Sequence, residues 1–157
     1  MFNNIVVATD GSEAAHRAVA VAGDLARSHR AKLTLLHVIE DPLLTPRGLT
    51  GAATPAATPL GLGRPAGLTA YREEAHRNAD RLLNAEKAQL SGDGIARIET
   101  LVAEGDPAER IIETAEREHA DAIVLGSRGL GDFKGLLVGS VSHKVASDAK
   151  CTCIAVT

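Results

Sequence analysis

The stretch "DAIVLGSRGLGDFKGLLVGS", from Asp121 to Ser140, joins an apolar run to a segment rich in glycine. Five of the chain's 15 glycines fall between Gly126 and Ser140. Glycine at this density suits a backbone that must adopt left-handed turns or let another group approach closely. The stretch is therefore either a loose surface loop or a cradle for a ligand, and the rest of the chain has to distinguish the two.

Length and composition predict one globular domain over residues 1–157. The chain has 157 residues, 45% of them hydrophobic and 24% charged, which is enough for a core of its own. No apolar run approaches the roughly 20 residues of a membrane span. The N-terminus lacks the basic region of a secretion signal. We therefore expect a cytoplasmic protein with no membrane association.

Charge and aromatic content argue against a nucleic-acid partner. The net charge is −3, acids and bases alternate along the chain, and aromatic residues make up only 2%. Neither a strongly positive surface nor a stacking platform is therefore expected. Cys151 and Cys153 could bind a metal or link two subunits. No nearby His or Cys cluster completes a metal site, so both are interpreted as small apolar residues of a strand.

Hydrophobic periodicity predicts strands alternating with helices. Strands are expected at Asn3–Asp10, Ala31–Glu40, Ala96–Gly105, Ala120–Gly126 and Cys151–Thr157. Helices are expected from Ser12 to His29, Leu68 to Leu90, Pro107 to His119 and Ser140 to Ala149. Asp41–Gly67 holds five of the six prolines and no apolar period, which predicts a long loop. A lid over a ligand and a plain insertion are both open interpretations of this loop.

This order predicts an α/β fold: a single doubly wound, Rossmann-like or flavodoxin-like domain. We expect a five-stranded parallel sheet with helices on both faces. Ligands in such sheets bind beyond the carboxyl ends of the strands, at the point where strand order reverses. The predicted strands end at Asp10, near Val38 and at Leu125. The glycine-rich segment begins at that edge, which favours a ligand cradle.

The glycine spacing excludes two common phosphate-binding patterns. The phosphate-loop pattern fails because Asp132 and Phe133 follow Gly131, and the dinucleotide pattern fails at Lys134. The spacing that does occur is Gly-x-x-Gly from Gly126, then nine residues, then Gly-Ser at 139–140. The last pair opens a predicted helix, whose N-terminal amides and partial positive charge suit a phosphate.

This segment resembles the G-2x-G-9x-G-[ST] signature of the universal stress protein family, in its ATP-binding branch. The resemblance extends to "IVVATDGSEAA", "LTLLHVIE" and the final "CTCIAV", and so covers nearly the whole chain. It implies a fold with five parallel strands, a homodimer, and binding of ATP or a related adenine nucleotide. The family's final turn often contains proline, whereas Lys150 and Thr152 stand here, next to the strand 152–156 that the resemblance makes the dimer contact.

The resemblance also implies roles for individual residues. Asp10 would lie near the ribose or bind the magnesium ion that accompanies the phosphates. The adenine and ribose would contact Ala8, Thr9 and Val38. The ribose and first phosphates would contact Leu125, Gly126, Arg128 and Gly129. The terminal phosphates would contact Gly139, Ser140 and Val141. Simpler roles stay open. Asp10 or Ser140 could serve merely as a helix cap, and Arg128 could be a solvated loop charge. His37 is expected to be a packed strand residue, and His16 a residue of the helix surface.

A binding module is expected rather than an enzyme. Hydrolysis of ATP needs a positioned water and a group that orients it. Asp10 is the acid that the pattern places at the site, and a metal would occupy it. The alternatives are a slow ATP-hydrolysing or nucleotidyl-transferring enzyme of similar fold, and a dimeric scaffold whose site stays empty. Steady-state ATP turnover would distinguish the enzyme from a binding module. Nucleotide that stays bound during purification would distinguish a binding module from the scaffold with an empty site.

Overall fold

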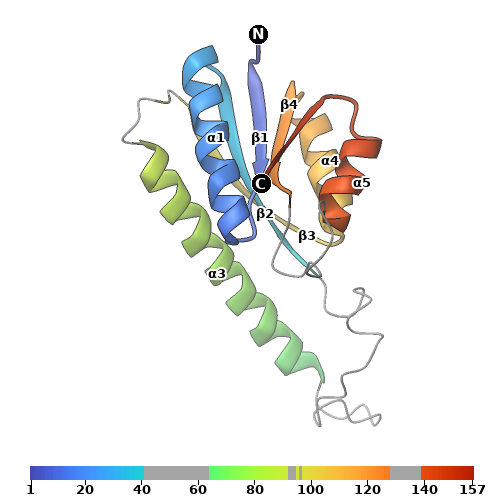
Figure 1. The fold of residues 1–157 in the computed structure, drawn as a ribbon. Helices are drawn as coiled ribbons and strands as arrows, with labels where there is room; N and C mark the ends of the chain where they lie inside the picture. The colour runs from blue at the N-terminus through green and yellow to red at the C-terminus, as the bar shows by residue number, and fades with distance from the viewer. Residues whose placement is uncertain (41–63, 92–94, 96, 128–138) are drawn as a thin grey trace.

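The computed structural model describes residues 1–40, 64–91, 95, 97–127 and 139–157 (Figure 1). Strands and helices alternate along the chain. In order they are β1 (Asn4–Ala8), α1 (Glu13–His29), β2 (Lys32–Ile39), α3 (Arg64–Ser91), β3 (Ile98–Glu104), α4 (Pro107–Arg117), β4 (Ala122–Gly126), α5 (Ser140–Asp148) and β5 (Thr152–Val156).

The strands form a five-stranded sheet in the order β3-β2-β1-β4-β5. All four neighbouring pairs are parallel. The predicted fold class is therefore confirmed, with the Rossmann-type strand order. The order reverses between β1 and β4, so the carboxyl ends of these two strands frame the place where such sheets bind ligands.

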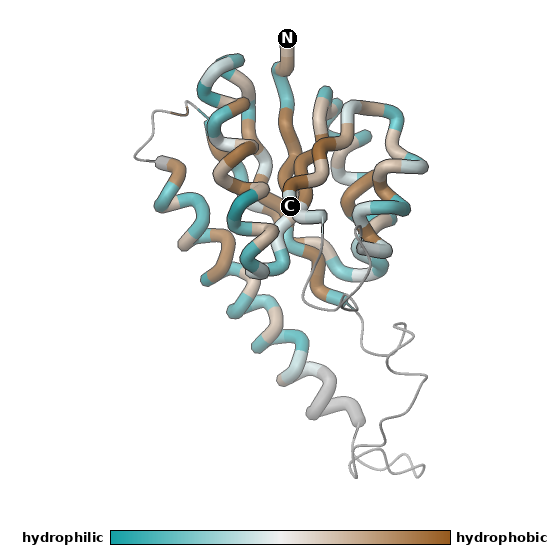
Figure 2. Tube along the Cα trace, viewed as in Figure 1, coloured by the Kyte–Doolittle hydropathy of each residue, from teal (hydrophilic) through white to brown (hydrophobic). Residues whose placement is uncertain are grey.

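Helices cover both faces of the sheet, α1 and α3 on one and α4 and α5 on the other (Figure 1). Successive side chains of a strand point to opposite faces. Ile5 and Val7 accordingly pack under α1 and α3, while Val6 packs under α4. Both faces of β1 are thus buried, which explains why its sequence is continuously apolar (Figure 2).

Local sequence sets the ends of α1 and α4. The Ser12 side chain accepts a hydrogen bond from the Ala15 N–H, and Arg30 ends α1 in the left-handed conformation at φ 55°. Asp106 caps α4 by accepting from the Glu109 N–H, and Pro107 occupies the first turn. Ser12 and Pro107 are the helix starts that the sequence predicts.

Several predicted boundaries are wrong by a few residues. β1 ends at Ala8 rather than Asp10, because Gly11 adopts φ 78° and the chain turns into α1. α3 begins at Arg64, inside the predicted loop, since Pro65 is compatible with the first turn of a helix. The remaining part of that loop, residues 41–63, lies outside the described residues.

The helix α3 is long and polar. It contains 28 residues and extends beyond the sheet at the edge where β1 ends (Figure 1). In the part of the chain that the structure describes, no helix combines the length and the apolar character needed to cross a membrane.

Candidate functional site

The carboxyl edge of the sheet brings together the ends of β1 and β4 and the starts of α1 and α5. Ala8 and Leu125 are register partners in the β1–β4 pair, one residue before β4 ends. The ends of β1 and β4, far apart in the sequence, therefore meet at the switch point. This is the arrangement that the glycine pattern predicts.

The turn from Thr9 to Ser12 is held by its own side chains. The Asp10 carboxylate accepts a hydrogen bond from the Ser12 N–H at 2.9 Å, and the Thr9 hydroxyl accepts from the Gly11 N–H at 3.3 Å. Ser12, and not Asp10, caps α1. Asp10 thus shapes the turn at the edge of the sheet, where its partly exposed carboxylate can also meet a ligand.

The end of β1 is tied to β2. The Thr9 N–H donates to the Leu36 carbonyl at 2.9 Å, and the Thr9 carbonyl lies 2.8 Å from His37 Nδ1. His37 therefore has a structural contact, in line with the expectation. Val38 and Ala8 are partly exposed, so both can contact a ligand at this edge.

Gly126, the last residue of β4, lies close against the start of α1. A Cβ atom on Gly126 would lie 3.0 Å from the backbone C of Ala14 and the backbone N of Ala15. The absent side chain therefore faces α1. Leu125 is 5% exposed and packs in the core, so only its backbone is available to a ligand.

The ends of the glycine-rich segment are joined to each other. The Ser127 carbonyl accepts a hydrogen bond from the Gly139 N–H at 2.6 Å and from the Ser142 hydroxyl at 3.1 Å. Both serines are buried. This clamp fixes the start of α5 against the end of β4, and the sequence analysis missed both residues, although they flank the motif as "GS" and "GSVS".

The N-terminus of α5 faces this edge. Its N-cap is Gly139, which has no side chain to satisfy the first amides. Ser140 is the first helical residue and is exposed, so the suggested capping role for Ser140 is wrong. The amides of Ser140 and Val141 belong to the first turn, where a helix offers them no carbonyl acceptor. Gly139 instead donates its amide to Ser127. Arg128 and Gly129, also predicted as site residues, lie outside the described residues.

A buried carboxylate, also missed by the sequence analysis, adjoins the Thr9–Ser12 turn. Glu86 of α3 is 2% exposed, and its Oε1 lies 2.6 Å from His16 Nδ1 and 3.5 Å from the Thr9 hydroxyl. His16 is exposed, as the sequence predicts, and its contact with Glu86 is what the sequence analysis missed. The available signal was the position of Glu86 in the apolar stripe of α3.

The charged clusters with shifted pKa values lie away from this edge. Lys32, at the start of β2, contacts Glu118 at 2.8 Å and Glu99 at 2.7 Å. Its hydrogen bond to Glu118 lowers the pKa of that carboxyl and raises the pKa of Lys32. Two backbone amides, of Asn3 and Asn4, hold the pKa of Asp121 below its usual value. These groups join elements at the amino end of the sheet and are interpreted as structural.

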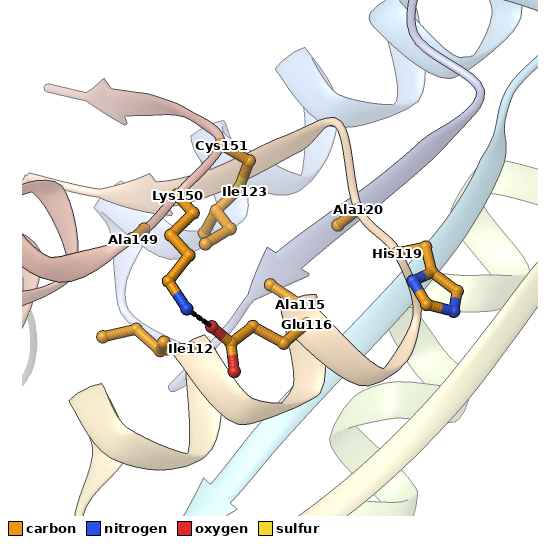
Figure 3. A pocket seen from close by; sticks show the side chains of 9 residues that line it. All are labelled: Ile112, Ala115, Glu116, His119, Ala120, Ile123, Ala149, Lys150 and Cys151. Atoms are coloured by element: carbon orange, nitrogen blue, oxygen red, sulfur yellow. Dashed lines mark hydrogen bonds and ion pairs between the residues drawn. The ribbon is translucent and has the colours of Figure 1, made fainter.

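A pocket of about 230 Å³ lies between α4 and the segment that enters β5, also away from the carboxyl edge (Figure 3). Lys150 and Glu116 form an ion pair of 2.9 Å across it. Cys151 lines the pocket, and burial raises the pKa of its thiol. A raised pKa keeps the thiol protonated and unreactive, which agrees with a packing role for this cysteine. Among the described residues, no cluster of three or more His, Cys, Asp or Glu residues could hold a metal.

The fold and the site define a Rossmann-like α/β protein with a glycine-rich segment at the switch point of its sheet. The sequence profile of the Universal stress protein family matches residues 1–157, and the chain belongs to this family. A universal stress protein of Thermus aquaticus, encoded in the QAH/OAS sulfhydrylase 3' region, is 38% identical over 154 residues, which span 96% of each chain. The universal stress protein YxiE of Bacillus subtilis is 33% identical over 151 residues, again 96% of each.

Solved structures of the family have the same fold. Universal stress protein UspA from Lactobacillus plantarum superimposes with a TM-score of 0.81 at 24% identity, covering 99% of this chain and 97% of the other. A universal stress protein in complex with cAMP gives 0.70 at 25% identity, covering 99% and 97%. The protein from Archaeoglobus fulgidus in complex with dAMP gives 0.67 at 21% identity, covering 99% and 98%.

Proposed function

We propose that the protein is an ATP-binding universal stress protein, a cytoplasmic module that responds to adenine nucleotide at the carboxyl edge of its sheet. The observation that supports this most is the clamp between Ser127 and Gly139, which holds the uncapped start of α5 at the switch point. Two free cysteines agree with a reducing compartment.

The phosphates would bind at the N-terminus of α5. The amides of Ser140 and Val141 and the Ser140 hydroxyl can donate to phosphate oxygens, and the helix dipole favours the negative charge. The adenine and ribose would lie on the side of Ala8, Thr9 and Val38. Adenine nucleotides in structures of the family support the choice of ligand, the cAMP complex above all, since it has 25% identity and covers nearly all of this chain.

The Asp10 carboxylate would coordinate the magnesium ion that accompanies the nucleotide. Mg²⁺ bound with a nucleotide usually takes one or two protein carboxylates, with phosphate oxygens and waters completing its shell. Asp10 supplies such a carboxylate at the switch point, and its hydrogen bond from Ser12 holds the side chain in one orientation. The donor chemistry therefore fits, and the ion would neutralise phosphate charge.

Binding rather than catalysis is the function that the site favours. Hydrolysis needs a group that orients water beside the terminal phosphate. Among the carboxylates described near the β1–β4 switch point, Asp10 would serve the metal, Glu86 is committed to His16, and Glu13 pairs with Arg17. A slow ATPase would show as steady-state phosphate release above that of an Asp10→Asn variant.

We also propose that two copies pair through β5. This strand is at the edge of the sheet, and such an edge is a template for another strand. Thr152 donates its N–H to Asp121, and the Val156 carbonyl accepts from Ser127, so the odd-numbered residues between them direct their amides outward. Cys153 and Ala155 would then pair with a second copy related by a two-fold axis.

Titration calorimetry with ATP and magnesium tests nucleotide binding. Three or four charge-assisted hydrogen bonds, less the ordering cost of binding, predict a Kd of roughly micromolar order. ATP at about a hundred times its Kd should raise the melting temperature by roughly 5–10 °C. Adenosine should bind at least about tenfold more weakly, because α5 would lose its partner.

Matched variants refine this test. Asp10→Asn should weaken the effect of magnesium, whereas Asp24→Asn, an exposed residue of α1, should not. A protein that shows neither binding heat nor a shifted melting temperature would refute the proposed function. Equal affinity for ATP and adenosine would refute the role of α5.

A further inference from the structure

Glu86 occupies a position of α3 where the helical spacing of buried residues predicts an apolar side chain. Over residues 69–90 of this helix, where burial is described, the buried residues are Ala79, Leu83, Glu86 and Leu90, which recur at helical spacing. Leu83 and Leu90 belong to the core beneath α1 and α3. Burying a carboxylate is costly unless it is paired, and a leucine of similar volume would complete the stripe without that cost.

All the hydrogen bonds described for the Glu86 carboxylate lead to one short segment. Its Oε1 contacts His16 in the first turn of α1 at 2.6 Å and the Thr9 hydroxyl at 3.5 Å. The Thr9 oxygen in turn accepts from the Gly11 N–H at 3.3 Å. The carboxylate thus ends a hydrogen-bonded chain that begins in the backbone of the turn carrying Asp10.

A second residue of α3 supports the same turn. Leu82, one helical turn before Glu86, lies where a Cβ atom on Gly11 would be 3.5 Å from its Cδ1. Gly11 adopts φ 78°, a conformation that glycine reaches without strain and other residues rarely adopt, so glycine itself allows the turn. Leu82 thus lies beside Gly11, and Glu86 contacts Thr9 of the same turn.

We propose that Glu86 is a positioning residue for the nucleotide site: it holds the Thr9–Ser12 turn so that Asp10 is presented in one orientation. This inference rests on the proposed function, because the turn is assigned to nucleotide binding there. The physical basis is preorganisation: a turn already held in its bound shape loses less conformational entropy when the ligand binds. Through Glu86, the position of α3 is coupled to the affinity of the site.

Three variants separate positioning from stability. Glu86→Leu removes the carboxylate but completes the apolar stripe, so the melting temperature should stay within about 3 °C or rise. The Kd for ATP should increase at least about tenfold, as preorganisation is lost. Glu86→Gln keeps an oxygen acceptor and should stay within about threefold of the parent. Glu74→Leu, an exposed position of the same helix, is the matched control and should change neither quantity.

Amide hydrogen exchange of the ligand-free protein gives a second readout that does not depend on ATP. In Glu86→Leu, exchange at Gly11 and Ser12 should accelerate at least about tenfold, while Val6 in the sheet should keep its protection. Thr9→Val replaces the hydroxyl that links Gly11 to Glu86 with a methyl group, and it should accelerate exchange at Gly11 and Ser12 in the same way.

The outcomes are distinct. Parent protein that binds no ATP refutes the proposed function, while the exchange rates still decide whether Glu86 holds the turn. Parent protein that binds ATP, with unchanged affinity and exchange in Glu86→Leu, overturns the positioning role. A Glu86→Leu chain that does not fold also overturns it, because the carboxylate would then serve stability.

Discussion

Replacing Gly126 by alanine tests whether this glycine serves the packing of α1 or the ligand. The new Cβ would lie 3.0 Å from two backbone atoms, of Ala14 and Ala15, and 3.1 Å from the Ala14 Cβ. Carbon atoms in contact prefer about 3.5–4.0 Å, so each contact is short by roughly half an ångström or more. Backbone atoms cannot rotate away, and α1 would have to shift from the sheet.

The magnitude follows from two opposing effects. Overpacking a well-packed site typically costs about 1–3 kcal/mol. Alanine also restricts the unfolded chain, which stabilises the protein by about 0.4–1 kcal/mol. The limits leave a net loss of about 0–2.6 kcal/mol, and the middle of that range, about 1–2 kcal/mol in the free energy of unfolding, is the expected value. For a chain of this size the melting temperature should fall by about 2–8 °C.

Calorimetric or fluorescence-monitored melting of Gly126→Ala without nucleotide measures this loss. Ala14→Gly removes one of the three contacts but leaves the two backbone atoms in place. Adding it to Gly126→Ala should therefore not restore stability. An unchanged melting temperature together with lost ATP binding would refute the reasoning, because a ligand and not α1 would then lie against Gly126.

Two further predictions concern stability at low pH and assembly. The pKa of Asp121 is lowered by the amides of Asn3 and Asn4, so its contribution to stability is present above the ordinary carboxyl value of 3.8 and is lost as the pH falls through the lowered pKa. At pH 7, urea unfolding of Asp121→Asn should give a free energy of unfolding about 1 kcal/mol below that of the parent, and this difference should shrink below about pH 4. A difference that does not depend on pH would contradict this. Ala155→Pro should weaken the dimer in sedimentation while the chain stays folded, since its amide faces away from β4, whereas Ala155→Ser should not; a parent protein that is monomeric at micromolar concentration would rule the dimer out.

Hydrophobic periodicity, together with helix-start and loop residues, was sufficient to predict the strands and helices and their order along the chain. The continuous apolar run of Ile5–Ala8 predicted a strand buried on both faces, and Ser12 and Pro107 marked helix starts that the structure confirms. These features are local: propensity, capping and spacing act over a few residues. The alternation of strands and helices then left a parallel sheet, and the glycine spacing placed a candidate site at its carboxyl edge.

The details of that edge were decided by contacts between residues far apart in the chain. Glu86 lies at the spacing of the apolar residues of α3, but only the packing of α3 against α1 shows that its carboxylate is buried beside Thr9. Gly126 reads as part of a ligand motif, whereas its missing side chain faces α1. The sequence alone therefore determined which elements form and in which order. The tertiary structure decided which side chains meet, because burial and hydrogen-bond partners depend on elements separated by 70 residues or more, as for His16 and Glu86.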